Sequence, residues 1–79
     1  MTSYYDITTD ELTEILKSYM KPKYWKLNNF ENVIANATID EEHNYVWFEL
    51  SSFDLALDID TLKYKDVVNI NGFDGGGSA

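Results

Sequence analysis

The stretch FDLALDID, residues 53–60, alternates between apolar and acidic side chains, with Ala56 as the one interruption. The aliphatic residues are Leu55, Leu57 and Ile59, and the acidic residues are Asp54, Asp58 and Asp60. Because successive side chains of a β-strand point to opposite faces of a sheet, this pattern predicts a strand with one buried and one exposed face. Such a strand needs neighbouring strands and a second layer that covers its buried face.

Two earlier stretches show the same period of two and are predicted to be the neighbouring strands. The apolar face comprises Val33, Ala35, Ala37 and Ile39 in NVIANATID (32–40), and Val46, Phe48 and Leu50 in NYVWFEL (44–50). The connections EEHN (41–44) and SSF (51–53) are short, which is typical of antiparallel hairpins. VVNI (67–70) is predicted to be a short fourth strand. The preceding TLKYKD (61–66) is predicted to be either one helical turn capped by Asp60 or an irregular loop.

The covering layer is predicted near the N-terminus, in ITTDELTEILKSYMKP (7–22). Thr8 and Glu11 have the spacing of a capping box, and Ile7 and Leu12 occupy the positions of a hydrophobic staple. One helical face is apolar and consists of Leu12, Ile15, Leu16, Tyr19 and Met20. Pro22 ends the pattern, because the residue before a proline avoids the α conformation. We therefore predict a helix over residues 9–20.

The predicted fold is α+β, with one N-terminal amphipathic helix packed on a three- to four-stranded antiparallel sheet (αβββ, possibly αββββ). A single domain is expected over residues 1–73, followed by a flexible Gly/Ser tail at residues 74–79. The aromatic connector KYWKLNNFE (23–31) is expected to cover an edge of the core. Since the chain has 79 residues and no cysteine, its core depends on large side chains, which two Trp, six Tyr and four Phe supply.

The formal charge of −8 arises from 14 acidic and six basic residues, and all six basic residues are lysine. So strong a negative charge opposes direct binding to DNA, RNA or an anionic membrane. The chain has no apolar stretch long enough to span a membrane, and MTSYYDITTDE does not have the pattern of a signal peptide. We therefore expect a cytoplasmic protein, in the host cytoplasm if it is phage-encoded.

The charges are segregated along the chain. Four of the six lysines lie between Lys17 and Lys26, where there is no acid, and no basic residue lies between Lys26 and Lys63. Pairing of the second and third strands through SSF is predicted to place Glu49 beside Asp54, Trp47 beside Ala56 and Tyr45 beside Asp58. Like charges on paired strands cost about 0.2–1 kcal/mol, yet this region has no lysine that would relieve them.

The exposed face of the sheet is thus predicted to combine two aromatic residues with four acids: Tyr45, Trp47, Glu49, Asp54, Asp58 and Asp60. One interpretation is a solvated face of a generally acidic protein. The other is a docking surface for a basic protein, because carboxylates attract lysine and arginine and the aromatic rings provide anchors. Alternate residues of a strand are roughly 6.6 Å apart, on the order of the spacing between backbone phosphates.

The sequence shows no pattern that predicts catalysis. The single histidine, His43, falls in the EEHN turn, where we expect little perturbation of its pKa, and Ser51 and Ser52 are typical turn residues. DEEH (40–43) and DID (58–60) could attract a hard cation, but neither has the ligand pattern of a calcium loop. We expect no enzymatic activity, no cofactor and no metal site.

The function expected from these features is non-enzymatic: binding and blocking a basic, nucleic-acid-binding surface of a larger protein. A small, acidic, cysteine-free chain rich in Asn and Tyr has the character of a phage-encoded counter-defence inhibitor, such as an anti-CRISPR protein or an anti-restriction DNA mimic. Two alternatives stay open: a small structural virion or assembly protein, and an immunity protein that neutralises a toxin. The sequence does not specify the oligomeric state.

Overall fold

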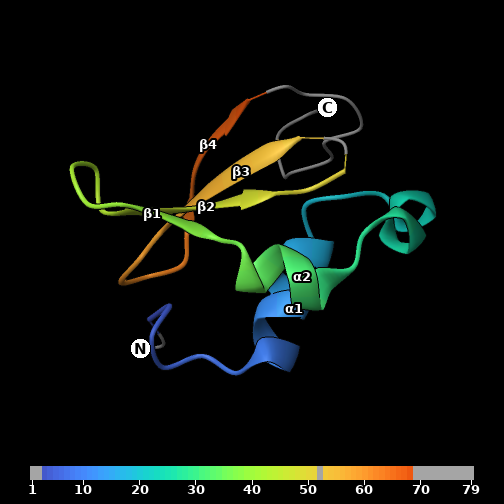
Figure 1. The fold of residues 1–79 in the computed structure, drawn as a ribbon, viewed down its shortest axis with the longest axis horizontal. Coiled ribbons are helices and arrows are strands. Elements are labelled where there is room, and N and C mark those ends of the chain that lie inside the picture. Colours follow the sequence, from blue (N-terminus) through green and yellow to red (C-terminus); the bar gives the residue numbers. More distant parts are fainter. Residues whose placement is uncertain (1–2, 52, 69–79) are drawn as a thin grey trace.

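The computed structural model describes residues 3–51 and 53–68 of the chain. Within that part, the elements follow in the order α1, η1, α2, β1, β2, β3 and β4, where η1 is a 3-10 helix. The strands form one antiparallel sheet in the order β1-β2-β3-β4, and the helical segments lie to one side of it (Figure 1). The α+β class and the fourth strand predicted from the sequence are confirmed. The predicted tail at residues 74–79 lies outside the described residues.

Helix α1 spans Thr9–Lys17, and its start is the predicted one. The Thr8 hydroxyl accepts a hydrogen bond from the backbone N–H of Glu11 at 3.1 Å, and the Glu11 carboxylate accepts one from the N–H of Thr8 at 3.2 Å. The predicted end at residue 20 is wrong by three residues. The N–H groups of Tyr19 and Met20 bond to the carbonyls three residues earlier, so the last turn tightens and leaves the α-helix before Pro22.

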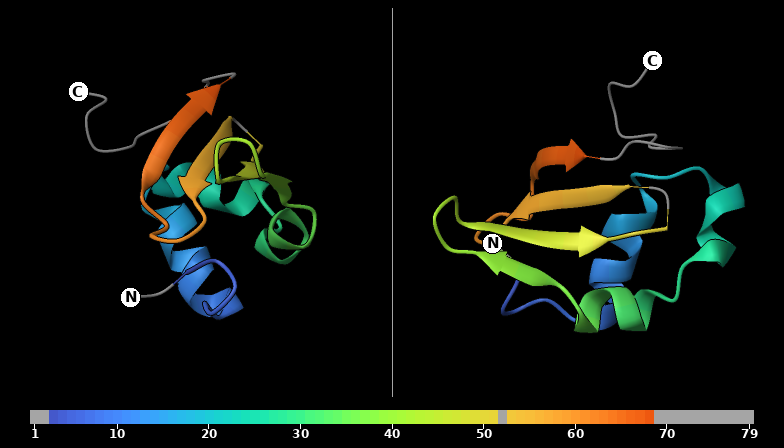
Figure 2. Two further views of the ribbon diagram at one scale, coloured as in Figure 1. Left: turned by 90° about the vertical axis from the view of Figure 1, so that its left-hand side faces the viewer. Right: turned by 45° about the horizontal axis from the view of Figure 1, so that its top comes forward.

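The 3-10 helix η1, Pro22–Leu27, lies within the segment predicted to be a connector. It stands at the end of the molecule that also holds the β2–β3 connection (Figures 1 and 2). Only part of this segment covers the core: Tyr24 packs against it, whereas Trp25 and Leu27 are 36% and 64% exposed. The expectation that the connector covers an edge of the core therefore holds for Tyr24 and Phe30 but not for Trp25.

Helix α2, Phe30–Ala35, replaces the first half of a predicted strand. The Asn29 side chain caps it by accepting a hydrogen bond from the N–H of Asn32 at 3.2 Å. Phe30, Val33 and Ile34 pack together against the core with the spacing of one helical face. The strand predicted over residues 32–40 shortens to β1, Thr38–Asp40. The N-cap and the helical period override the weaker alternation, which used small alanines at two positions.

Strands β2 (Tyr45–Glu49) and β3 (Asp54–Asp58) pair as predicted. Their register places Tyr45 opposite Asp58, Trp47 opposite Ala56 and Glu49 opposite Asp54. Strand β3 is shorter than the predicted stretch and ends at Asp58, so Asp60 lies in the following turn.

Strand β4, Tyr64–Val68, begins three residues earlier than predicted, and residues 69–70 of the prediction lie outside the described part. Neither structure proposed for residues 61–66 is fully correct. Asp58, rather than Asp60, organises this turn: its Oδ1 accepts hydrogen bonds from the N–H groups of Asp60 and Thr61 at 2.8 and 3.0 Å. Leu62 closes the turn with φ 58°, a left-handed conformation in which its side chain is buried.

One apolar cluster joins the helical segments, the strands and the turns between them. Its buried members are Leu12, Leu16, Met20, Val46, Phe48, Leu50, Phe53, Leu55, Leu57, Ile59 and Leu62. The inward residues of β2 and β3 are thus those that the alternation predicted. The residues that alternate with them in β2 and β3 lie on the opposite face of the sheet.

Candidate functional site

The six residues predicted to bind a partner lie along β2, along β3 and in the turn after β3. We call them the acidic face: Tyr45, Trp47, Glu49, Asp54, Asp58 and Asp60. The pairing of β2 with β3 brings the first five together on the side of the sheet away from Val46 and Phe48, which are fully buried. The Glu49–Asp54 pair places two acids directly opposite each other across the ladder.

The face is less open than an alternating strand suggests. Ala56 is fully buried although it occupies an outward register position, between Trp47 on β2 and Asp66 on β4. Tyr45, Trp47 and Asp58 are half-buried. Because Ala56 is small, the larger side chains on either side of it cover it. The aromatic rings of Tyr45 and Trp47 are therefore partly packed against the sheet.

The aromatic part of the face continues into the β1–β2 turn. The ring of Tyr45 stacks on His43 with centroids 5.3 Å apart, and it meets Trp47 edge-on at 6.4 Å. His43 was not predicted to be part of the site. The signal was present in the sequence, since His43, Tyr45 and Trp47 are alternate residues, but His43 was assigned to the turn alone.

His43 forms a hydrogen-bonded ion pair with Asp40, with 2.9 Å between Nδ1 and Oδ2. This hydrogen bond and the charge of Asp40 raise the pKa of His43 above its ordinary value. The same hydrogen bond from His43 is the main cause that lowers the pKa of Asp40. The expectation that the turn leaves the histidine unperturbed is therefore wrong, because the fold places a carboxylate beside it.

Asp58 is fixed by the turn that it organises. Partial desolvation raises the pKa of its carboxyl, but the backbone hydrogen bonds from Thr61 and Asp60 and the charge of Lys65 outweigh it, so that the pKa lies below its ordinary value. Lys65 occupies the irregularity in the β3–β4 pairing, between Tyr64 and Asp66. Lys65 lies outside the lysine-free stretch between Lys26 and Lys63, and its charge acts on Asp58 from β4.

Asp60 approaches the face from the turn rather than from β3. Its Oδ2 accepts a hydrogen bond from Nδ2 of Asn44 at 2.9 Å, and the carbonyl of Asn44 accepts one from the N–H of Ile59 at 3.0 Å. Asn44 has φ 61°, a conformation that asparagine tolerates better than most residues. These contacts tie the β1–β2 turn to the β3–β4 turn and fix one end of the acidic face.

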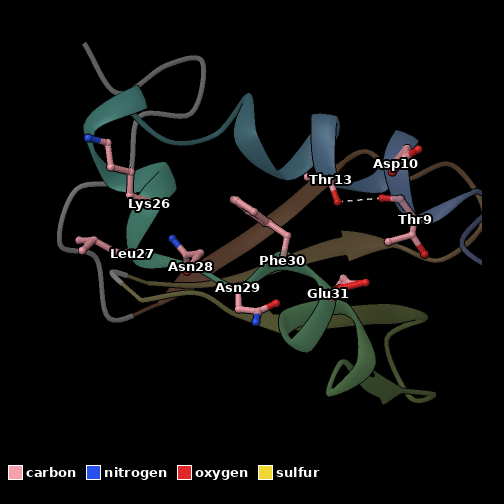
Figure 3. Close-up of a pocket in the computed structure, with 9 residues that line it drawn as sticks. All are labelled: Thr9, Asp10, Thr13, Lys26, Leu27, Asn28, Asn29, Phe30 and Glu31. Carbon is pink, nitrogen blue, oxygen red and sulfur yellow. Dashed lines mark hydrogen bonds between the residues drawn. The ribbon is translucent and has the colours of Figure 1, made fainter.

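A separate open groove of about 820 Å³ lies on the helical side of the molecule (Figure 3). It runs between α1 and the segment that joins η1 to α2, and its lining includes Asp10, Lys26 and Glu31. The hydroxyl of Thr13 points to the carbonyl of Thr9, to which it donates a hydrogen bond of 2.8 Å. The groove shares no residue with the acidic face.

Within residues 3–51 and 53–68, no three His, Asp or Glu side chains are grouped so that they could hold a metal ion. In the same part of the chain, no helix is both long enough and apolar enough to cross a membrane. Comparison of the chain with protein-family models, with curated proteins and with solved structures found no match.

Proposed function

We propose that this protein is a non-enzymatic inhibitor that docks its acidic face onto the basic, nucleic-acid-binding surface of a larger protein. The observation that supports the proposal most directly is the β2–β3 register. It aligns two pairs of opposed polar positions, Glu49 with Asp54 and Tyr45 with Asp58, on either side of Trp47. A partner with lysines and arginines would neutralise these acids and speed its own association by electrostatic attraction.

The aromatic residues supply the short-range part of the interaction. Tyr45 and Trp47 are half-buried and contact each other edge-on, so that little side-chain entropy remains to be lost on binding. Ordered aromatic residues of this kind are the usual anchors of protein interfaces. An arginine over the Trp47 ring would add about 0.5–2 kcal/mol by cation–π attraction.

We also infer that α1 covers the inner face of the sheet, which would leave the acidic face as the accessible one. Leu12 and Leu16 support this arrangement, because both are buried in the same cluster as Phe48 and Leu55. A protein built this way would present its acids on one side only. It would act in the compartment that holds its partner, which for a phage-encoded inhibitor of host or defence proteins is the host cytoplasm.

The experiment is affinity capture from a host lysate at low and high salt, with identification of the captured proteins by mass spectrometry. We expect the wild type to retain nucleic-acid-binding proteins at about 0.1 M NaCl and to release them at about 0.5 M, because salt screens the attraction. Added DNA or RNA should displace the protein from the same partners. Displacement distinguishes a blocked nucleic-acid site from general adhesion between opposite charges.

Two variants with the same change of charge make the test specific. Glu49→Lys alters the acidic face, whereas Glu31→Lys alters an exposed acid on α2. We expect Glu49→Lys to lower retention about five- to tenfold and Glu31→Lys to leave it nearly unchanged, since rim charges act mainly on nearby partner charges. If both variants retain the same proteins equally well, the acidic face is not the docking surface.

A further inference from the structure

The second charged feature of the molecule is a compact cluster of lysines around η1. Lys17, Lys21, Lys23 and Lys26 supply four of the six positive charges of the chain, and no acid lies between the first and the last of them. We call this cluster, together with Trp25 and Leu27, the basic lobe. Helix η1, which carries Lys23 and Lys26, stands at one end of the molecule, beyond the strands, and Lys17 ends α1 (Figures 1 and 2).

The lobe is held by contacts that do not use its charges. The indole N–H of Trp25 points to the backbone carbonyls of Lys17 and Met20, at 3.2 and 3.3 Å. At the other end of η1, Asn28 Oδ1 accepts a hydrogen bond of 2.7 Å from the N–H of Ser51. A segment fixed in this way loses little conformational entropy when it binds.

Three of the four lysines of the lobe are available to a partner, whereas Lys17 is half-buried and pairs with Glu14 at 3.8 Å. Lys21, Lys23 and Lys26 are exposed, and among the described residues none of them has a carboxylate within ion-pair distance. Two lysines already lie over aromatic rings: the Lys17 ammonium is 5.1 Å from the Trp25 centroid, and that of Lys23 is 5.2 Å from Tyr24. Lysines of the lobe thus already contact aromatic rings within the molecule. The rings of Tyr45 and Trp47 on the acidic face could bind lysines of another molecule in the same way.

The lobe and the acidic face are complementary in charge and in chemistry. The lobe presents three exposed lysines and the exposed side chain of Leu27, while the face presents four acids and the rings of Tyr45 and Trp47. We propose that a second copy of this chain occupies the acidic face with its basic lobe. The contact would be heterologous, head to tail, so that each copy has one free lobe or one free face to extend the association.

The net charge of −8 limits this association without preventing it. At physiological salt, charges are screened over about 8 Å, so the opposed charges at the contact attract while the remaining acids of the two copies interact weakly. At very low salt the long-range repulsion between copies grows. The association is therefore expected to be strongest at intermediate salt, a signature that purely apolar association would not show.

This inference uses the acidic face of the proposed function but does not require the proposed partner. Self-association and partner binding would compete for one surface, so the protein would become available as an inhibitor on dilution. Neutralising the lobe should leave capture of the partner intact. A protein that does not self-associate can therefore still bind the partner, and the two experiments test the two proposals separately.

The test is sedimentation velocity on purified protein, from about 20 µM to about 1 mM, the range in which weak interfaces are populated. One variant, Lys23→Gln/Lys26→Gln, removes charge from the lobe, and the other, Glu49→Gln/Asp54→Asn, removes it from the face. Asp10→Asn/Glu31→Gln is the charge-matched control for the face, and Lys63→Gln, which removes one charge, is the control for the lobe, since these residues are exposed and lie outside both surfaces. Circular dichroism establishes that each variant is folded.

We expect the wild type to show a rising average mass at about 0.1 M NaCl, with association at least about tenfold weaker at 0.5 M. Each neutralised variant alone should be monomeric, and the controls should behave as the wild type does. An equimolar mixture of the two neutralised variants should form a dimer that does not grow, because only one intact lobe can meet one intact face. A wild type that stays monomeric, or a mixture that does not dimerise, would overturn the proposal; the second result would indicate a two-fold contact instead.

Discussion

Individual charged residues of this small protein are positioned by hydrogen bonds that leave them accessible. Asp58 organises a turn through the N–H groups of Asp60 and Thr61, and Asp60 accepts a hydrogen bond from Asn44. A carboxylate can accept about four hydrogen bonds, which is more than these contacts use at either residue. The acidic face therefore combines fixed positions with free acceptor capacity, which favours recognition of a cationic partner.

The Asp40–His43 pair makes stability depend on pH in a defined window. Because the pKa of His43 is raised in the folded protein, protonation of His43 stabilises the fold. This stabilisation is fully present below about pH 6.5 and is lost as the pH rises through the pKa of the folded state. The lowered pKa of Asp40 stabilises the fold as well. This stabilisation is fully present above about pH 4 and is lost as the pH falls through the pKa of the folded state. The pair thus stabilises the fold most between these limits.

NMR titration measures this directly, because His43 is the single histidine of the chain. We expect an apparent pKa above about 6.5 in the wild type and a return toward that value in Asp40→Asn. The denaturant concentration at the unfolding midpoint should decrease as the pH is raised from about 6 to about 8 in the wild type, and should not change with pH in His43→Gln. Equal pKa values in the wild type and Asp40→Asn would show that the pair does not form in solution.

Glu49→Lys is expected to raise stability while it weakens partner binding. It converts the Glu49–Asp54 like-charge pair into an opposite-charge pair, a change of about 0.2–1 kcal/mol in the free energy of unfolding. Urea denaturation measures the change, and Glu49→Gln, which removes only the repulsion, should gain less. Loss of stability in Glu49→Lys would mean that Glu49 makes a favourable contact in the native state.

At the scale of elements, α1 is defined at its start by local signals and held in place by burial. Thr8 and Glu11 complete the capping box, while Leu12 and Leu16 are its buried residues. A nine-residue helix is too short to be stable alone in water. Its persistence must therefore come from the cluster that Leu12 and Leu16 share with the strands.

Two substitutions separate these contributions. Leu16→Ala should lower the free energy of unfolding by about 2–5 kcal/mol through lost burial and a residual cavity. Thr8→Ala should lower it by about 1 kcal/mol through loss of the cap. Thermal and urea unfolding followed by circular dichroism give both values, with the exposed Thr9→Ala as the control. A small effect of Leu16→Ala, similar to that of the control, would contradict the proposed packing of α1 on the sheet.

At the scale of the whole molecule, the excess of acids acts against the compact state. The described residues contain two ion pairs within 4 Å, Glu14–Lys17 and Asp40–His43, and both join residues three positions apart. Among the described residues, charge pairs between distant parts of the chain therefore contribute little, whereas the 14 acids of the chain repel one another. The segregation of four lysines into the basic lobe places most of the positive charge of the chain away from the acidic face, while Lys65 acts on Asp58.

Salt is therefore expected to stabilise the monomer. Raising NaCl from about 0.01 M to about 0.2 M shortens the screening length from about 30 Å to less than 10 Å, which weakens repulsion between distant acids more than attraction between adjacent charges. The melting temperature at low protein concentration should rise over this range and then level. A falling melting temperature would indicate that favourable ion pairs outweigh the repulsion.

The sequence by itself determined the features whose signals are local or strictly periodic. The Thr8–Glu11 spacing located the start of α1, and the alternation in residues 45–49 and 54–58 determined which side chains of β2 and β3 are buried and how these strands pair. These predictions held because capping and pleating depend on a few neighbouring residues. The composition of the acidic face follows from that register.

Only the tertiary structure decided the features that depend on contacts between distant or competing segments. Helix α2 formed where alternation predicted a strand, since the Asn29 cap and the packing of Phe30 favour the helix. The early start of β4 brought Lys65 to Asp58, and the contact between the β1–β2 and β3–β4 turns brought Asn44 to Asp60. In these cases the local pattern allowed more than one conformation, and the energy of packing and of specific charge contacts selected among them.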